Sequence, residues 1–321
     1  MKRSFVLIAA LGGAIAPPSP AQEYPAKPVR LVVGFPAGGG SDIIARLVAQ
    51  KLGGALGQPV VVENRPGASA NIAAEVVAKS APDGYTLLFG NSSLSISQAV
   101  FTKLNYDPVR DLVPISMASS YPFALTVHPS LPVKNVKQLV AFARAQPGAL
   151  AYASAGAGTM SHMAMELLRL RAGGLQLQHL PYKGAAPASV SLISGETQLA
   201  FVVMPVAAVQ VRAGKLRGLA VAAPARSTAL PEMPTMEEAG VAGHQAVQWN
   251  GFFAPARTPQ PVIERLHREV AKTVHLPEVR QRFEAEGATP AGTSPAEFAA
   301  FFRSETEKWA EVARLSGTRL D

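Results

Sequence analysis

The chain has 321 residues, a formal net charge of +8 at pH 7, 48% hydrophobic residues and no cysteine. Without cysteine it can form no disulfide and carry no lipid at a cleaved N-terminus. The basic charge favours anionic ligands, but the sequence has no Lys/Arg run, aromatic interleaving or zinc-ligand spacing, so nucleic acid is not an expected partner. The length exceeds what one small core needs, so we expect two domains.

Residues 1–21 are expected to be a cleaved signal peptide. Met1 to Ser4 is basic, residues 5–16 are apolar, and Ser19-Pro-Ala21 forms a small-residue cleavage site. The apolar run is shorter than the roughly 20 residues that a membrane-spanning helix needs, and no later segment is long and uncharged enough to span. We therefore expect a free periplasmic protein whose mature chain does not enter the membrane. A retained short anchor is the alternative.

The first turn, Phe35-Pro-Ala-Gly-Gly-Gly-Ser41, lies between a predicted strand (Val29–Phe35) and a predicted helix (Ser41–Leu56). Backbone N–H groups at such a turn meet the positive end of the helix dipole, which suits a carboxylate. The turn contains neither Gly-Lys-Ser/Thr nor Gly-x-Gly-x-x-Gly, so nucleotide binding is disfavoured. A tight turn without a ligand is the alternative. We interpret Asp42 as a dipole partner or cap of the helix, because a carboxylate there would repel an anion.

Strand-like and helix-like segments continue to alternate along the chain. A strand at Val60–Glu63, a loop at Gly67–Asn71 and a helix at Ile72–Lys79 precede a strand at Tyr85–Phe89. Such alternation is typical of α/β sheets with helical crossovers. Ligands bind these sheets at loops beyond the C-terminal ends of the strands.

A second block repeats the pattern of the first turn. A strand at Phe123–His128, a helix at Val136–Ala145 and a strand at Leu150–Ala153 lead to the second turn, Ser154-Ala-Gly-Ala-Gly-Thr159. Apolar residues from Met163 to Leu170 then predict a helix that ends in a glycine pair. Two lobes with opposed anion-binding turns are what a hinged receptor needs, because each lobe supplies donors and closure encloses the ligand.

Further strands at Leu199–Val203, Leu216–Val221 and Gln248–Ala254 precede two C-terminal helices. The last helix opens with the capping box Ser294-Pro-Ala-Glu297 and carries aromatic residues on one side, as expected of a core-facing helix. Trp249 is interpreted as a hinge or core residue.

Six motifs follow one another along the chain: Tyr24-Pro-Ala-Lys-Pro-Val-Arg-Leu-Val-Val-Gly-Phe-Pro-Ala-Gly-Gly-Gly-Ser-Asp42, Val61-Val-Glu-Asn-Arg-Pro-Gly67, Ala81-Pro-Asp-Gly-Tyr-Thr-Leu87, Tyr106-Asp-Pro-Val-Arg-Asp111, His179-Leu-Pro-Tyr-Lys-Gly184 and Ala213-Gly-Lys-Leu-Arg217. With these motifs the chain resembles the Bug family, the periplasmic solute-binding proteins of tripartite tricarboxylate transporters. The resemblance covers essentially the whole mature chain, and six motifs in order are far more specific than one.

The resemblance implies an α/β, periplasmic-binding-protein-like (type II) Venus flytrap in which a hinge joins two α/β lobes. Lobe one would comprise residues 22–124 and 248–321, and lobe two residues 125–247. It also implies a monomer without a cofactor. Such a receptor would hold a small-molecule carboxylate by backbone N–H groups and ordered water, and deliver it to membrane transporter subunits.

By this resemblance, both lobes contribute ligand-binding residues. Lobe one would supply the first turn and the loops 68–71 and 91–94, and lobe two the second turn and the start of the following helix. The expected contact residues are Phe35, Ala37, Gly38, Gly39, Ser69, Ala70, Ser92, Ser93, Ser154, Gly156, Gly158, Thr159, His162 and Val202.

Two departures from the family pattern bear on the ligand. Where many relatives have Phe-Asp-Asn-Leu-Pro, this chain has Phe201-Val-Val-Met-Pro205. Val202 thus replaces an aspartate able to bind a ligand ammonium, so an amino-acid ligand is disfavoured. Gly67-Ala-Ser-Ala-Asn71 replaces the usual Gly-Ala-Gly-Gly-Asn, which adds bulk where backbone normally approaches closely. A di- or tricarboxylate and an aromatic or partly apolar carboxylate remain as alternatives.

Several side chains allow two interpretations. Ser154 and Thr159 either donate to the ligand or bond within their own turn. His162 faces either the cleft or the lobe core. Lys183 is expected on the surface.

Enzymatic functions find little support. The six histidines show no metal-ligand spacing, and Tyr152 stands where a Gly-x-Ser-x-Gly elbow needs its first glycine. We therefore expect no catalytic residue and no metal; an exported serine hydrolase using Ser154 and His162 is a remote alternative. A nearer alternative keeps the site and changes the partner, as a ligand-sensing subunit that docks onto a sensor kinase.

Overall fold

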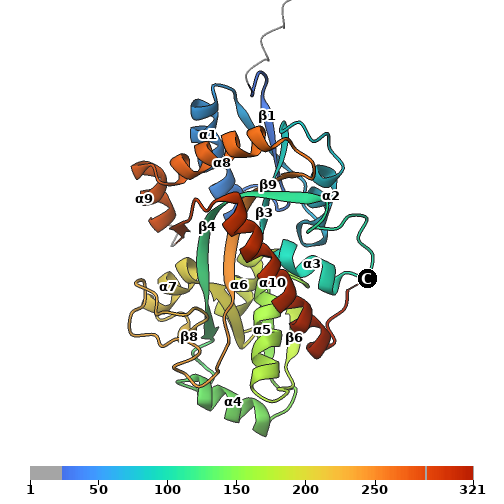
Figure 1. The fold of residues 1–321 in the computed structure, drawn as a ribbon. Helices are drawn as coiled ribbons and strands as arrows, with labels where there is room; N and C mark the ends of the chain where they lie inside the picture. The colour runs from blue at the N-terminus through green and yellow to red at the C-terminus, as the bar shows by residue number, and fades with distance from the viewer. Residues whose placement is uncertain (1–23, 286–287, 321) are drawn as a thin grey trace, which may run out of the picture.

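The computed structural model describes residues 24–285 and 288–320, and the predicted signal peptide lies outside these residues. Strands and helices alternate along the chain (Figure 1). The strands are β1 Val29–Val33, β2 Val60–Asn64, β3 Thr86–Asn91, β4 Leu112–Val127, β5 Ala151–Ser154, β6 Gln178–Pro181, β7 Leu199–Val203, β8 Arg217–Val221, β9 Val247–Pro255 and β10 Thr289–Pro290. The helices are α1 Gly40–Leu56, α2 Asn71–Ala78, α3 Ser93–Val100, α4 Val136–Ala145, α5 Met160–Arg171, α6 Ala185–Ser194, α7 Met204–Arg212, α8 Gln260–Val274, α9 Pro277–Ala285 and α10 Pro295–Ser316, with a 3-10 turn, η1, at Ala68–Ala70.

Strand β4 is much longer than the sequence predicts. The predicted strand at Phe123–His128 corresponds only to its last part, whereas β4 begins at Leu112. The earlier part of β4 was not predicted because it contains Pro114 and Pro122, and proline within an apolar run argues against a strand. The structure accommodates Pro114 beside a shift in the β4–β9 register.

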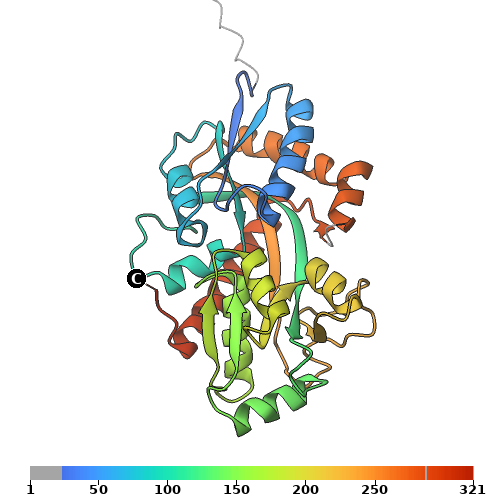
Figure 2. The same ribbon diagram turned by 180° about the vertical axis from the view of Figure 1, so that it is seen from behind.

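Strands β4 and β9 join two halves of one sheet, whose strand order is β2-β1-β3-β9-β4-β7-β5-β6, with β8 and β10 also paired to β4. In one half β1 pairs in parallel with β2 and β3, and in the other β5 pairs in parallel with β6 and β7. Strand β4 pairs with β9 up to Pro122 and with β7 from Phe123 onwards. Figures 1 and 2 show both long strands passing between the upper and the lower half of the molecule.

Each half has hydrophobic clusters on both faces of its sheet. In the upper half, α1 and α8 cover one face and α2 covers the other. In the lower half, α4 and α5 cover one face, and α6 and α7 cover the other. Burial of these apolar faces drives formation of both halves. The ends of β1 and β5, where the two turns begin, therefore rest on rigid cores.

Helices α3 and α10 contribute to both halves. Phe298 and Phe302 of α10 pack in the upper half, whereas Trp309 packs in the lower half. In α3, Leu94 lies in an upper cluster and Val100 in a lower one. The lobe limits expected from the sequence, 22–124 with 248–321 and 125–247, stay a prediction. Because α3 and α10 pack in both halves, neither helix belongs to one half alone.

No helix in the part of the chain that the structure describes combines the length and apolar character needed to cross a membrane.

Candidate functional site

The first turn connects β1 to α1 and is largely exposed. Gly38 has a φ of +78°, a left-handed conformation that glycine adopts without strain. The Gly38 N–H donates to Asp42 Oδ2 at 2.8 Å, and the Gly39 N–H donates to Pro36 O at 3.2 Å. We expected both N–H groups to be available to a ligand. That expectation is corrected, because both donors are engaged within the turn.

Available donors lie one residue further along. Within the described residues, the backbone N–H groups of Gly40 and Ser41 have no hydrogen-bond partner. They open α1, where N–H groups are unsatisfied by the helix and carry positive partial charge. Ala37 is exposed and Phe35 is half-buried beside them. This end of α1 can therefore receive an anion.

Asp42 holds the first turn in place. Its carboxylate is buried and accepts hydrogen bonds from Gly38 N, Asn64 Nδ2 at 2.8 Å and Arg46 Nε at 2.9 Å. Burial by itself would raise the pKa of Asp42, but the bonds from Arg46, Asn64 and Gly38 outweigh burial and keep the pKa below its usual value. The interpretation of Asp42 as a partner of the helix start is confirmed.

The second turn connects β5 to α5 in a similar way. Gly158 has a φ of +74°, and its N–H donates to His162 Nδ1 at 3.1 Å. The Gly156 N–H donates to Ser154 Oγ at 3.2 Å, and Thr159 Oγ1 donates to Gly156 O at 2.7 Å. The N–H groups of Gly156 and Gly158 are thus engaged internally, which again corrects their expected availability. Of the two interpretations of Ser154 and Thr159, the structure contains the hydrogen bonds within their own turn.

Donors remain in the second turn as well. Within residues 24–285 and 288–320, the N–H groups of Ala157 and Met160 have no hydrogen-bond partner. Met160 is the first residue of α5, so its N–H belongs to a helix N-terminus, as in the first turn.

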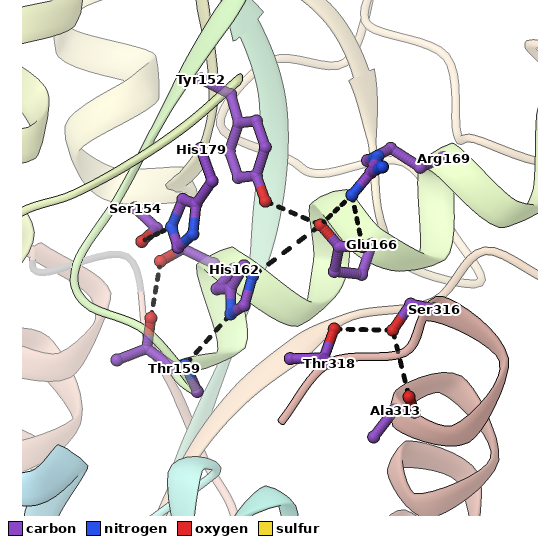
Figure 3. Close-up of polar contacts among 12 residues, drawn as sticks. Tyr152, Ser154, Thr159, His162, Glu166, Arg169, His179, Ala313, Ser316 and Thr318 are labelled. Atoms are coloured by element: carbon purple, nitrogen blue, oxygen red, sulfur yellow. Dashed lines mark hydrogen bonds and ion pairs between the residues drawn. The ribbon is translucent and has the colours of Figure 1, made fainter. Parts of the chain in front are cut away.

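Three rings stack beneath the second turn (Figure 3). The ring centroids of Tyr152 and His179 lie 4.7 Å apart, and those of His179 and His162 lie 4.0 Å apart with planes only 7° from parallel. His179 Nε2 lies 2.6 Å from Ser154 Oγ, the group that accepts the Gly156 N–H. Both glycine N–H groups of the turn are therefore linked to an imidazole, one directly and one through Ser154.

An ion pair between the buried Glu166 and the half-buried Arg169 adjoins this cluster. Glu166 accepts two hydrogen bonds from Arg169 Nη1, at 2.8 and 2.7 Å, and one from Tyr152 OH at 2.7 Å. His162 Nε2 lies 3.8 Å from Glu166 Oε1. Figure 3 shows the end of α10, with Ser316 and Thr318, beside this part of α5.

Both imidazoles of the cluster are neutral at pH 7. Burial, and then the positive charge of Arg169, lower the pKa of His162 to about 4. Burial, and then His162, lower the pKa of His179 to about 3, although Glu166 opposes this shift. Because Nδ1 of His162 accepts a hydrogen bond, the neutral ring carries its proton on Nε2.

The loop at 67–71 brings the upper half into contact with the second turn. Ser69 Oγ donates to Ala157 O at 2.8 Å. Ala68, Ser69 and Ala70 have φ values of 46°, 53° and 77°, which residues with a side chain seldom adopt. Such strain persists where the surrounding structure holds it, often at functional sites. A Cβ at Gly34 would lie 2.3 Å from Ala70 Cβ, so the close approach of this loop to the end of β1 requires glycine at 34.

Three expected contact residues are buried. Ser92 Oγ donates to Gln248 Oε1 at 2.8 Å, and the Ser93 N–H donates to Asn91 Oδ1 at 3.0 Å. Val202 packs in the apolar cluster beneath α6 and α7. Contact between these side chains and a ligand stays a prediction.

The hydrolase alternative pairs Ser154 with His162, but the structure pairs Ser154 with His179 and leaves only 1% of Ser154 exposed. Lys183 is exposed and Trp249 is fully buried, as expected. Among the described residues, no group of histidine, aspartate and glutamate side chains is arranged to hold a metal ion.

Sequence reasoning missed Tyr152, Glu166, Arg169 and His179. His179 opens one of the six motifs, and the parallel register of β5 and β6 places it opposite Tyr152. That register could have been anticipated only by assuming that β5 and β6 are neighbours in the sheet. Glu166 follows His162 by one helical turn, so their proximity on α5 was readable from spacing.

A sheet that continues through two α/β halves, with a loop of the upper half in contact with a glycine turn of the lower half, is the architecture of a two-lobed solute-binding protein. The chain belongs to the tripartite tricarboxylate transporter receptors, because the family model of that description matches residues 44–317. Protein BugT of Bordetella pertussis is 38% identical over 98% of this chain and 96% of BugT. The predicted membership of the Bug family is confirmed.

Solved structures agree with this assignment. An R. palustris protein solved with adipate superposes with a TM-score of 0.84 at 34% identity, covering 93% of this chain and 100% of that one. MatC from Rhodopseudomonas palustris with bound malate gives a TM-score of 0.82 at 31% identity, covering 90% and 99% of the two chains. These similarities confirm the predicted two-lobe, type II fold.

Proposed function

We propose that this protein is a periplasmic receptor that captures an organic carboxylate between its two lobes and delivers it to a tripartite tricarboxylate-type transporter. The observation that carries the proposal is the contact at the junction of the lobes, where Ser69 Oγ lies 2.8 Å from Ala157 O. This contact joins the upper-half loop to the second turn, and the start of α5 follows directly. The proposed site thus includes residues 35–41, 68–71 and 154–162.

Unpartnered backbone amides supply the proposed binding chemistry. The N–H groups of Gly40 and Ser41 open α1, and those of Ala157 and Met160 flank the start of α5. Hydrogen bonds to a charged group contribute roughly 1.5–3 kcal/mol each. Micromolar affinity needs about 8 kcal/mol, so about four such donors with apolar contacts reach that value after ordering costs.

The proposed ligand class follows from both the site and the similar structures. Helix N-termini favour carboxylates, and the similar R. palustris proteins were solved with adipate and with malate. We propose an aliphatic dicarboxylate as the first class to test, with tricarboxylates and aromatic carboxylates next. Val202 in place of an aspartate argues against a ligand ammonium.

The direct test is a binding screen on protein that has been unfolded and refolded to remove any co-purified ligand. Thermal stabilisation by a dicarboxylate, followed by calorimetry, is the expected result. Failure of every mono-, di- and tricarboxylate to stabilise the refolded protein would overturn the proposed ligand class. Capture of the transporter's membrane subunits by the loaded protein would test delivery, and capture of a sensor kinase instead would favour the sensing alternative.

A single amide can be removed to test the proposed donors. In Gly40→Pro the N–H is lost, while proline is well accommodated at the first position of a helix. The preceding residue, Gly39, has φ −77° and ψ 162°, which is compatible with a following proline. Gly40→Ala keeps the N–H and is the matched control, because a Cβ there meets nothing within 4 Å.

We expect Gly40→Pro to weaken dicarboxylate binding by about 10-fold or more, since one bond to a charged group is lost. Gly40→Ala should bind like the wild type. Equal affinities of the two variants would exclude the Gly40 amide as a ligand donor.

A further inference from the structure

The same local hydrogen bond, from a turn glycine N–H to a side chain at the third helical residue, holds both turns. Asp42 is the third residue of α1 and accepts the N–H of Gly38, four residues earlier. His162 is the third residue of α5 and accepts the N–H of Gly158, also four residues earlier. In each case the accepting atom is three bonds from Cα, so Nδ1 of histidine occupies the place of a carboxylate Oδ. Both devices resemble a capping box, in which a side chain at this helix position reaches back to a backbone N–H.

The surroundings of His162 suit a neutral acceptor. Its titratable neighbours are His179 from β6, Tyr152 from β5, and Glu166 and Arg169 from its own helix. Glu166 Oε1 lies 3.8 Å from His162 Nε2. A second carboxylate at position 162 would therefore be buried near Glu166, where like charges are costly. A neutral imidazole accepts the Gly158 N–H without adding negative charge.

We propose that His162 is a positioning residue of the carboxylate site. As a buried, neutral acceptor for the Gly158 N–H, it fixes the second turn, as the Asp42 carboxylate fixes the first. His162 thus acts through Gly158 and does not bind the ligand itself. By holding Gly158, it fixes the backbone from Ala157 to Met160. The N–H groups of Ala157 and Met160 themselves remain available to a ligand. The inference rests on the proposed function for its consequence in binding, but the hydrogen bond can be tested without a ligand.

The test compares two variants of similar shape. His162→Asn retains an acceptor, because Asn Oδ1 is three bonds from Cα, like Nδ1 of His162 and Oδ2 of Asp42. His162→Leu has no acceptor. The ligand-free readout is exchange of the Gly158 amide proton by NMR. We expect His162→Leu to accelerate this exchange by about 10-fold or more, and His162→Asn to leave it within about 3-fold of the wild type.

The binding readout uses adipate and malate as probes. We expect His162→Asn to bind within about 3-fold of the wild type and His162→Leu to bind about 2- to 10-fold more weakly, as for loss of one hydrogen bond. If His162→Asn protects Gly158 but loses binding as His162→Leu does, the imidazole contacts the ligand and the proposal is overturned. Unchanged Gly158 exchange in His162→Leu would also overturn it.

A measurement on the wild type keeps the inference testable should either variant fail to fold. The NMR chemical shifts of the two imidazole nitrogens of His162 should show a neutral ring protonated on Nε2. The ring should convert to the charged form only near pH 4. A proton on Nδ1 at pH 7 would overturn the proposal. If the wild type binds neither probe while Gly158 exchange follows the expected pattern, the proposed ligand is wrong and the positioning role stands.

Discussion

The first and second turns have the same order of strand, glycine turn and helix, yet they are stabilised in different environments. The first turn is exposed, and its acceptor, Asp42, is an ionised carboxylate bound by Arg46 and Asn64. The second turn lies over a buried cluster, and its acceptor, His162, is a neutral imidazole stacked on His179. The difference teaches that environment selects the chemical form of the acceptor: a charge where a cation can balance it, and a neutral ring beside the buried Glu166.

The largest expected difference concerns the glycines themselves. Gly38 and Gly158 have nearly equal φ values, but a Cβ at Gly38 meets nothing within 4 Å, whereas one at Gly158 would lie 2.9 Å from Leu320 Cδ1 and 3.1 Å from Val100 Cγ2. Gly38→Ala should lower the free energy of unfolding by about 1–2 kcal/mol through backbone strain. Gly158→Ala should lower it by about 2–4 kcal/mol, because overpacking is added. Urea unfolding of both variants measures the difference, and equal losses would contradict the stated role of packing.

The two acceptors should also respond differently to acid. The pKa of His162 is about 4 in the folded protein and 6.5 in the reference state, so the unfolded chain binds the proton first as the pH falls. Stability from the neutral ring is complete above pH 6.5 and declines down to about pH 4, which amounts to about 2 kcal/mol between pH 7 and pH 5. His162→Asn should remove this contribution. His244, whose pKa burial also lowers to about 4, and His179 will continue to titrate in the variant.

Asp42 provides the matched control for that experiment. Its folded pKa is lowered, so its stabilising contribution is complete above the unfolded value near 3.8 and is lost only as the pH falls through the folded pKa. Asp42→Asn should therefore leave the change in stability between pH 7 and pH 5 as in the wild type. A smaller change in Asp42→Asn, or an unaltered one in His162→Asn, would contradict the assignment of neutral and charged acceptors.

The smallest expected effect concerns the contact between the lobes. Ser69→Ala removes the hydroxyl that donates to Ala157 O, and one net hydrogen bond is worth about 0.5–1.5 kcal/mol. The affinity for a bound dicarboxylate should therefore fall by about 2- to 10-fold. Ala68→Gly is the control, because it relieves a left-handed φ of 46° in the same loop and retains Ser69 Oγ. Equal affinities of the two variants would exclude a role of this bond in closure.

Much of the local structure around the candidate site could be predicted from the sequence. The glycines of the two turns, the helices that follow them and the six motifs pointed to the correct family and fold. Even the bonds from Gly38 to Asp42 and from Gly158 to His162 span only four residues, and a capping rule extended by one position would have found them. We expected the N–H groups of Gly38, Gly39, Gly156 and Gly158 to bind the ligand, whereas the unpartnered donors in the described residues of the two turns include those of Gly40, Ser41, Ala157 and Met160.

The sequence by itself determined the order of strands and helices, because hydrophobic period, glycine and capping residues act over a few positions. Tertiary structure decided what depends on distant segments. It placed His179 against Ser154 and His162, and it carried β4 through both halves despite its prolines. It also brought Ser69 to Ala157, 88 residues away in sequence. No local rule specifies these contacts. The contacts of His179 depend on the pairing of β5 with β6, and the others depend on two packed cores that share one sheet.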